Sequence, residues 1–140
     1  MWNGEWRKFK KFSCMGENTG KIRSFTDLIV WREGHTLVLE VYRATENFPR
    51  AEIFGLVNQM RRCAVSITSN IAEGFGRKSY KEKVQFYSIS KGSVLELQNQ
   101  LLISRDIGFL QKNIFDMISE QSITVSKLLT GIIRKSKDFS

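Results

Sequence analysis

Apolar positions in the middle of the chain recur at spacings of three and four, the period of a helix that buries one face. In the first segment, residues 27–46, the recurring residues are Leu28, Trp31, His35, Val38 and Tyr42. A capping-box pattern, Ser24-Phe25-Thr26-Asp27, precedes the segment, and Asn47-Phe48-Pro49 follows it. Because proline ends the helical hydrogen-bond ladder, the pattern predicts one helix over residues 27–46.

A second helix is predicted over residues 51–73. Its apolar positions follow the alternating spacing of a heptad seam: Ile53, Val57, Met60, Ala64, Ile67 and Ile71. Gly74 and Gly76 come next, where glycine commonly supplies the left-handed backbone of a helix C-terminus. We therefore expect these two glycines to end the helix.

Two further helices complete the expected fold. Ser79-Tyr80-Lys81-Glu82 forms another capping box, and the helix that it starts reaches about Arg105, before a turn at Asp106-Ile107-Gly108. Its apolar positions are Val84, Tyr87, Val94, Leu97 and Leu101. The last helix, over residues 111–136, has Ile114, Met117, Ile118, Val125, Leu128, Leu129, Ile132 and Ile133. Four long helices with short loops predict an all-α, antiparallel up-down-up-down four-helix bundle.

Composition divides the chain into two parts. Of its net charge of +8, residues 1–23 supply +4, from six basic and two acidic side chains. We expect residues 1–23 to be a flexible basic N-terminal extension and residues 24–140 to be the bundle domain. A solubilising leader is favoured over a nucleic-acid-binding arm, which stays the alternative. No apolar run approaches a membrane span, and two isolated cysteines, Cys14 and Cys63, favour the reducing cytoplasm.

The stretch SNIAEGFGRKS, residues 69–79, resembles a phosphate-binding loop at first sight. A P-loop needs Gly-x-x-x-x-Gly-Lys-Ser/Thr after a strand, whereas here Ile71 occupies the first glycine position, Arg77 follows Gly76, and a helix precedes. The pattern therefore excludes a nucleotide loop. A weaker anion site remains: free amides at the start of the third helix lie beside basic residues, namely Arg77, Lys78, Lys81 and Lys83.

Residues suited to catalysis are scarce. His35 is the one histidine of the chain, and its place on the apolar side of the first helix favours a hydrogen-bonded core residue over a base or ligand. Glu33 and His35 are two residues apart and cannot face the same way, so a di-metal bundle site is not encoded. We expect no catalytic residue, no metal, no cofactor and no small-molecule substrate.

The second helix also has a polar stripe opposite its apolar seam, formed by Gln59, Arg62, Ser66, Asn70 and Glu73. Small residues in Ser90-Lys91-Gly92-Ser93 predict a close approach of another helix to the third helix. Counting outward from the loop near Gly76 brings Arg62 toward Glu96. We hypothesise that the stripe and Glu96 are structural, or form a subunit interface, with Arg62 and Glu96 as an ion pair. The alternative is an exposed Arg62 that contacts RNA.

Residues 25–135 resemble a known family. The similarity is carried by Phe48-Pro49, Gly55-Leu56, Gln59-x-Arg61-Arg62, Ser66-Ile67 and Asn70-Ile71-Ala72-Glu73-Gly74, together with Asp27-Leu28-x-Val30-Trp31, Glu52 and Gly92-Ser93. These motifs resemble four-helix-bundle proteins encoded within intervening sequences of bacterial large-subunit ribosomal RNA genes, which are related to accessory variability proteins of diversity-generating retroelements. The resemblance implies a non-enzymatic, ring-shaped homopentamer. In the retroelement branch it implies binding to RNA and a reverse transcriptase.

Two functions from different classes stay open. In the first, a basic oligomeric bundle binds structured RNA through its phosphates, as an accessory subunit of a ribonucleoprotein. The residues expected to bind the RNA are Arg61, Arg77, Lys78, Lys81, Lys83 and Lys91. In the second, the chain is a protein-interaction scaffold whose basic residues form a solvated surface. Charge and the family resemblance favour the first.

Overall fold

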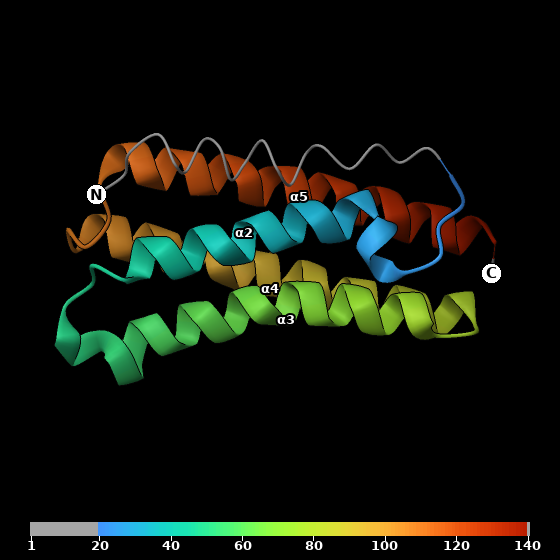
Figure 1. The fold of residues 1–140 in the computed structure, drawn as a ribbon, viewed down its shortest axis with the longest axis horizontal. Helices are drawn as coiled ribbons and strands as arrows, with labels where there is room; N and C mark the ends of the chain where they lie inside the picture. Colours follow the sequence, from blue (N-terminus) through green and yellow to red (C-terminus); the bar gives the residue numbers. More distant parts are fainter. Residues whose placement is uncertain (1–19, 140) are drawn as a thin grey trace.

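The structure is a computed structural model that describes residues 20–139. Figure 1 shows four long helices: α2 (Ile29–Thr45), α3 (Asn58–Gly76), α4 (Tyr80–Asp106) and α5 (Lys112–Asp138). Short helical turns, η1 (Phe25–Asp27), η2 (Arg50–Glu52) and η3 (Ile53–Val57), lie in the connections. No strand occurs in this range, which confirms the all-α prediction with four helices. Most of the predicted N-terminal extension, residues 1–19, lies outside the described residues.

The two capping boxes form, with differences from the prediction. Ser24 caps η1 instead of α2: its Oγ accepts a hydrogen bond from the Thr26 amide, while the Asp27 carboxylate accepts from the Ser24 amide. Leu28 has an extended backbone, so α2 starts just after it. At α4, Ser79 Oγ accepts from the Glu82 amide at 3.1 Å. The Glu82 carboxylate accepts from the Ser79 hydroxyl and not from the backbone.

The segment before α3 is irregular, and here the predicted helix start at residue 51 is wrong. Gly55 has φ −105° and ψ −114°, which lies outside the helical region. The Glu52 carboxylate accepts a hydrogen bond from the Leu56 amide at 3.1 Å and so replaces a helical backbone bond. Regular α-helix begins at Asn58.

The two glycines at the end of α3 do not have the predicted left-handed backbone. Among the described residues, Gly108 alone has a positive φ, 86°, at the turn predicted between α4 and α5. Gly74 is buried within α3, and a Cβ added there would lie 2.6 Å from Cε1 of Tyr87 on α4. Gly74 is therefore needed because the two helices approach closely, while Gly76 has open space around it.

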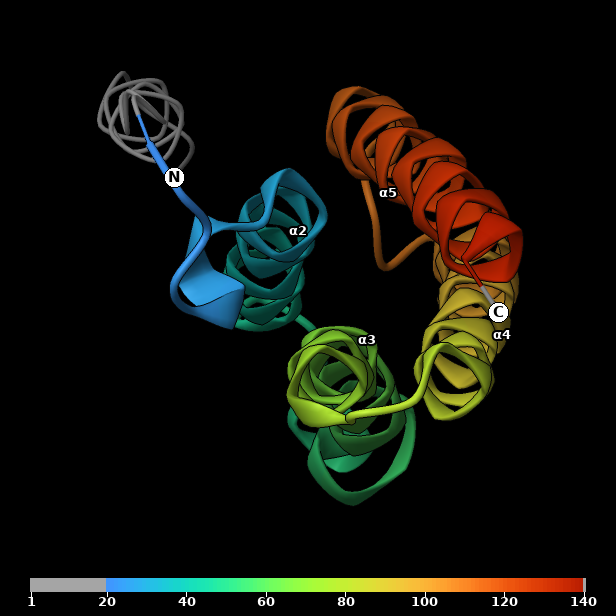
Figure 2. The same ribbon diagram turned by 90° about the vertical axis from the view of Figure 1, so that its right-hand side faces the viewer.

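Small side chains bring α3 and α4 together, as the sequence predicted. The Ser90 hydroxyl donates to the Ile67 carbonyl at 2.7 Å, and the Cys63 thiol lies 3.0 Å from the Ser93 carbonyl. Figure 2 shows the two helices side by side. Gly92 does not take part, because it is exposed and nothing lies within 4 Å of where its Cβ would be.

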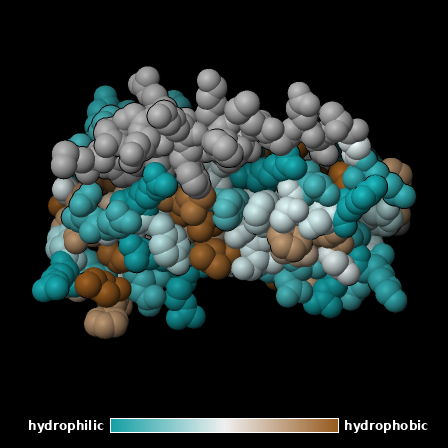
Figure 3. All heavy atoms as spheres, in the orientation of Figure 1, coloured by the Kyte–Doolittle hydropathy of each residue, from teal (hydrophilic) through white to brown (hydrophobic). Residues whose placement is uncertain are grey.

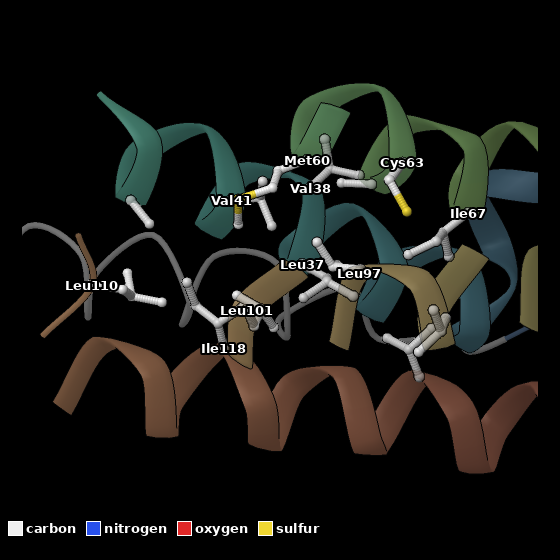
Figure 4. Close-up of a cluster of buried hydrophobic side chains, with 14 of the residues drawn as sticks. Leu37, Val38, Val41, Met60, Cys63, Ile67, Leu97, Leu101, Leu110 and Ile118 are labelled. Atoms are coloured by element: carbon white, nitrogen blue, oxygen red, sulfur yellow. The ribbon is translucent and has the colours of Figure 1, made fainter. Parts of the chain in front are cut away.

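The core lies between the four helices, and Figure 4 shows its centre around Leu37, Met60, Ile67 and Leu101. The predicted α3 seam is buried at every position except Ile53, which is 48% exposed in η3. Helix α2 buries only part of the predicted face: Val38 is buried, and Leu28 and Trp31 pack against the core. Its buried side carries Leu37, Val41, Ala44 and the fully buried Glu40, whereas Trp31 and His35 are half-buried and Tyr42 is exposed.

Candidate nucleic-acid interface

A row of open hollows forms a groove along the outer side of α3. Its middle hollow, about 520 Å³, is lined by Arg61, Arg62 and Ser69, with Tyr42 of α2. A second hollow of about 550 Å³ toward the α2–α3 connection shares Asn58 and Arg61 with the middle one. A third, about 610 Å³, shares Ser69 and reaches the end of α3. We call the three hollows together the α3 groove.

The α3 groove is rich in arginine. Four arginines line it, against two carboxylates: Arg50, Arg61, Arg62 and Arg77, with Glu46 and Glu73. A guanidinium is planar and presents several N–H donors in a fixed fork, which matches two oxygens of a phosphate. The groove therefore has the shape and the charge to follow an anionic chain.

Arg61, one of the predicted RNA-binding residues, also joins α2 to α3. Its Nε donates to Thr45 Oγ1 at 2.9 Å and its Nη2 donates to the Tyr42 carbonyl at 3.3 Å, near the C-terminus of α2. Its guanidinium lies over the Tyr42 ring, 4.7 Å from the centroid. These contacts hold the cation and the ring at the groove wall, so that ligand contacts by Arg61 would not require further ordering.

Arg62 and Glu96 do not form the hypothesised ion pair within residues 20–139. Both side chains are exposed, Arg62 lines the α3 groove, and the Glu96 carboxylate instead accepts from Gln100 Nε2 at 3.4 Å. Equal distance from a loop does not fix how a helix is rotated about its axis. Cys63, the next residue, takes the position that faces α4.

Because it faces α4, Cys63 is buried, and its thiol has low reactivity. Burial, with the nearby negative charge of Glu96, raises the pKa of its thiol to about 12. A thiol with such a pKa stays protonated near neutral pH, whereas the nucleophile and metal ligand is the thiolate. Cys63 therefore serves packing between α3 and α4.

The predicted polar stripe divides into two groups. Ser66 belongs to the α3–α4 contact, since its hydroxyl lies 3.0 Å from the Ser93 hydroxyl, and Asn70 supports it from within α3, where Asn70 Nδ2 donates to the Ser66 carbonyl at 2.8 Å. Gln59, Arg62 and Glu73 are exposed. The structural role predicted for the whole stripe therefore agrees with the position of Ser66 and Asn70, its half-buried members.

The predicted basic cluster does meet at the α3–α4 loop, but two of its four members hold the loop together. Lys83 Nζ donates to the carbonyls of Phe75 at 2.7 Å and Gly74 at 3.3 Å, and burial lowers the pKa of its ammonium group. Arg77 pairs with Glu73 at 3.2 Å and lies over the Phe86 ring.

The other two cluster members, Lys78 and Lys81, have exposed side chains. Lys91, the remaining predicted RNA-binding residue, is half-buried further along α4 and does not join the cluster. Ten residues separate it from Lys81, which is about 15 Å along a helix. Arg61 likewise lies in a different part of α3 from Arg77.

Sequence reasoning missed Phe54 and Arg50. Phe54 is 93% exposed and lines the hollow beside the α2–α3 connection, as does the exposed Arg50. In Figure 3 apolar atoms project from the molecule at the lower left, the end where this connection lies in Figure 1. The neighbouring Phe48-Pro49 marks the connection, because the residue before a proline is pushed out of the helical region. It does not indicate which side chains face solvent, since Phe48 itself is buried.

His35 differs from the expected core histidine. It is half-buried, and its ring stacks on Trp31 with centroids 4.7 Å apart. Within the described residues, no three histidine, cysteine or acidic side chains gather as they would around a metal ion. Nor is any helix in that range long and apolar enough to cross a membrane.

Four helices and a groove lined by four arginines describe a helical protein with a basic surface along α3. The family model described as "23S rRNA-intervening sequence protein" matches residues 26–131, and the chain belongs to that family. The family resemblance inferred from the sequence motifs is therefore confirmed.

A solved structure supports the fold. A protein of unknown function from the S23 ribosomal protein family of Bacteroides thetaiotaomicron VPI-5482 is 20% identical, with a TM-score of 0.69. The similarity covers 76% of this chain and 96% of that one. No curated protein sequence matches this chain.

Proposed function

We propose that this protein is a non-enzymatic, cytoplasmic oligomer that binds structured RNA through the α3 groove. The observation that carries the proposal is the set of arginines that line the α3 groove: Arg61 and Arg62 on α3, Arg77 at its C-cap and Arg50 in η2. The exposed Lys78 and Lys81 extend the positive surface beyond the end of α3. Such a surface binds phosphates with little dependence on base sequence.

The proposal takes the helices as an antiparallel up-down-up-down bundle. Contacts across α3 and α4 support this arrangement, since Gly74 lies against Tyr87 near the loop and Met60 meets Ser104 far from it. Across α4 and α5, Arg105 lies over the Phe115 ring near the turn, and Gln98 bonds Ser122 farther away. In this topology the α3 groove lies on the outside of the α2–α3 hairpin.

An apolar stripe on the outer side of α4 supports a homo-oligomer. Ile89, Leu95, Leu102 and Ile103 are 43–61% exposed, and the exposed Gly92, Glu96 and Asn99 lie among them. These residues span about 21 Å of helix and share one side of α4. A second copy of the chain would bury this stripe, and the family resemblance makes a homopentamer the expected assembly.

Partners beyond RNA follow from the resemblance to the retroelement branch: a reverse transcriptase and a role as an accessory subunit of a ribonucleoprotein. The competing function is a protein-interaction scaffold without nucleic-acid binding. The apolar α4 stripe favours it, because the same side chains would also bind an unrelated protein.

Titration of a structured RNA at several salt concentrations tests the proposal. Replacing Arg50 and Arg62 with glutamine removes two groove charges, and the matched control replaces Arg134 and Lys135, both exposed on α5. The groove variant should lower the magnitude of the log–log salt slope by about 1.4 to 1.8, and the control should leave it unchanged. Equal slopes in the two variants would reject the groove as the site, and salt-insensitive partner capture without RNA binding would favour the scaffold.

A further inference from the structure

The α2–α3 connection presents a large aromatic side chain to solvent. Phe54 is 93% exposed, and its neighbour Ile53 is 48% exposed. Burying a phenylalanine gains about 1.5 to 3 kcal/mol, so a site that leaves one in water forgoes this stabilisation. In the same segment Val57 is buried and Leu56 packs against the core.

Phe54 is held outward by a defined backbone. The Glu52 amide donates to the Pro49 carbonyl at 2.9 Å, and the Glu52 carboxylate accepts from the Leu56 amide at 3.1 Å. Between them Gly55 has a non-helical backbone, and a Cβ there would lie 2.9 Å from the Glu52 carboxylate. These contacts on both sides fix the position of Phe54, so that a ligand contacting the ring need not order this segment first.

The hollow beside Phe54 has a mixed lining that suits a nucleobase. Its volume is about 550 Å³, and Phe54, Ile53 and Val57 supply apolar surface while Asn58 supplies an amide. Glu46, the carboxylate in this lining, would repel a phosphate, but it accepts hydrogen bonds from the exocyclic amines of bases. Arg50 and Arg61 line the same hollow and match phosphates on either side of a base.

The hollow continues into the more polar part of the α3 groove. It shares Asn58 and Arg61 with the hollow that holds Arg62, and the Arg61 guanidinium is already stacked on the Tyr42 ring. Aromatic rings beside a positively charged groove are how proteins bind unpaired nucleotides. A duplex cannot use an exposed ring in this way, because its bases are stacked on one another.

We propose that Phe54 is a stacking platform for an unpaired nucleobase of the bound RNA, whose adjoining phosphates lie along Arg61 and Arg62. This inference rests on the proposed function and adds the class of ligand: a structured RNA with an unpaired loop or bulge. Asn58 and Glu46 supply the hydrogen-bond partners for the edge of the stacked base.

Fluorescence-anisotropy titrations of the full chain with two labelled RNAs test the inference. One RNA is a hairpin with an unpaired loop of about ten nucleotides, within the usual span of single-strand sites, and the other is a blunt duplex of equal total length. The variants are Phe54→Ala and Phe54→Trp. The control is Phe139→Ala, because Phe139 is an aromatic residue 63% exposed at the other end of the bundle.

Phe54→Ala should weaken hairpin binding roughly tenfold or more and leave duplex binding and the salt slope unchanged, because stacking is lost and no charge is removed. Phe54→Trp should retain hairpin binding, and Phe139→Ala should match the wild type. A 2-aminopurine base in the loop should be quenched by the wild type and not by Phe54→Ala. Light scattering of each variant reports the oligomer mass.

Three results would overturn the inference: hairpin binding by Phe54→Ala equal to wild type, an equal loss on hairpin and duplex, or a changed oligomer mass, which would assign Phe54 to a contact between copies. If the wild type binds neither RNA, the proposed function fails as well. If the wild type binds both with a steep salt dependence and Phe54→Ala behaves identically, the proposed function stands and the stacking platform does not.

Discussion

The two sides of α3 follow different physical rules. Toward α4 the helix has small or buried side chains, among them Cys63, Ile67 and Gly74, and the helices touch through serine hydroxyls. On the outer side it has Arg62, Ser69 and Arg77 along a groove. Packing density fixes the inner side, where one added methyl group matters. The outer side is free of that constraint, so its arginines are available for the ligand binding that we propose.

The largest expected effect of a substitution near neutral pH comes from the closest approach on the inner side. Gly74→Ala should lower the free energy of unfolding by about 1 to 3 kcal/mol, because the new Cβ would lie 2.6 Å from the Tyr87 ring. Gly76→Ala is the matched control: Gly76 has open space and ordinary negative φ, so this change should stabilise by about 0.4 to 1 kcal/mol. Chemical denaturation measures both. Equal effects at the two glycines would contradict the close approach.

On the outer side, substitutions at the adjacent Arg61 and Arg62 distinguish an arginine that stabilises the fold from one that does not. Arg61→Ala should cost about 1 to 2 kcal/mol of stability, since it removes hydrogen bonds to Thr45 and the Tyr42 carbonyl and the contact with the Tyr42 ring. Arg62→Ala should change stability by less than about 0.5 kcal/mol, because its side chain is exposed. Thermal unfolding compares them, and a larger loss for Arg62 would place it in the packing.

The buried Cys63 thiol on the inner side should make the stability of the protein depend on pH. The pKa of Cys63 rises from 9.0 to about 12 on folding, so the folded state keeps the proton that the unfolded state loses above pH 9. The thiol's contribution to stability is therefore complete below pH 9 and declines as pH rises toward 12, by at most about 1.4 kcal/mol per pH unit. Cys63→Ala should flatten this part of the stability–pH curve. An unchanged curve would mean that the thiol is solvated.

Periodicity predicted the buried side of α3 well, and the α2 face and the α2–α3 connection less well. The α3 seam from Val57 to Ile71 was right because heptad spacing and burial coincide there. The α2 face was right at Val38 and wrong at Tyr42, because apolar residues cover a wide arc of that helix and spacing alone does not locate the centre of the arc. Phe54 was missed because the spacing predicts regular helix over residues 51–57, whereas Glu52 and Gly55 interrupt it.

The sequence predicted which basic residues gather at the α3–α4 loop more accurately than it predicted the contacts that each side chain makes. Arg77, Lys78, Lys81 and Lys83 were expected together and do lie at one loop, since sequence neighbours across a tight turn meet. The sequence did not predict that Lys83 bonds the last carbonyls of α3, because this contact depends on how its side chain crosses the loop. The Arg62–Glu96 pair failed because it required the rotation of two helices about their axes.

Arginine footprinting tests the central claim most directly, that RNA binds the outer side of α3. Phenylglyoxal modification of the full chain, with and without a structured RNA, is read by peptide mass spectrometry at Arg50, Arg62 and, as a control on α5, Arg134. The account predicts that RNA protects Arg50 and Arg62 and leaves Arg134 as reactive as before. Equal protection at all three arginines, or protection at Arg134 alone, would contradict it.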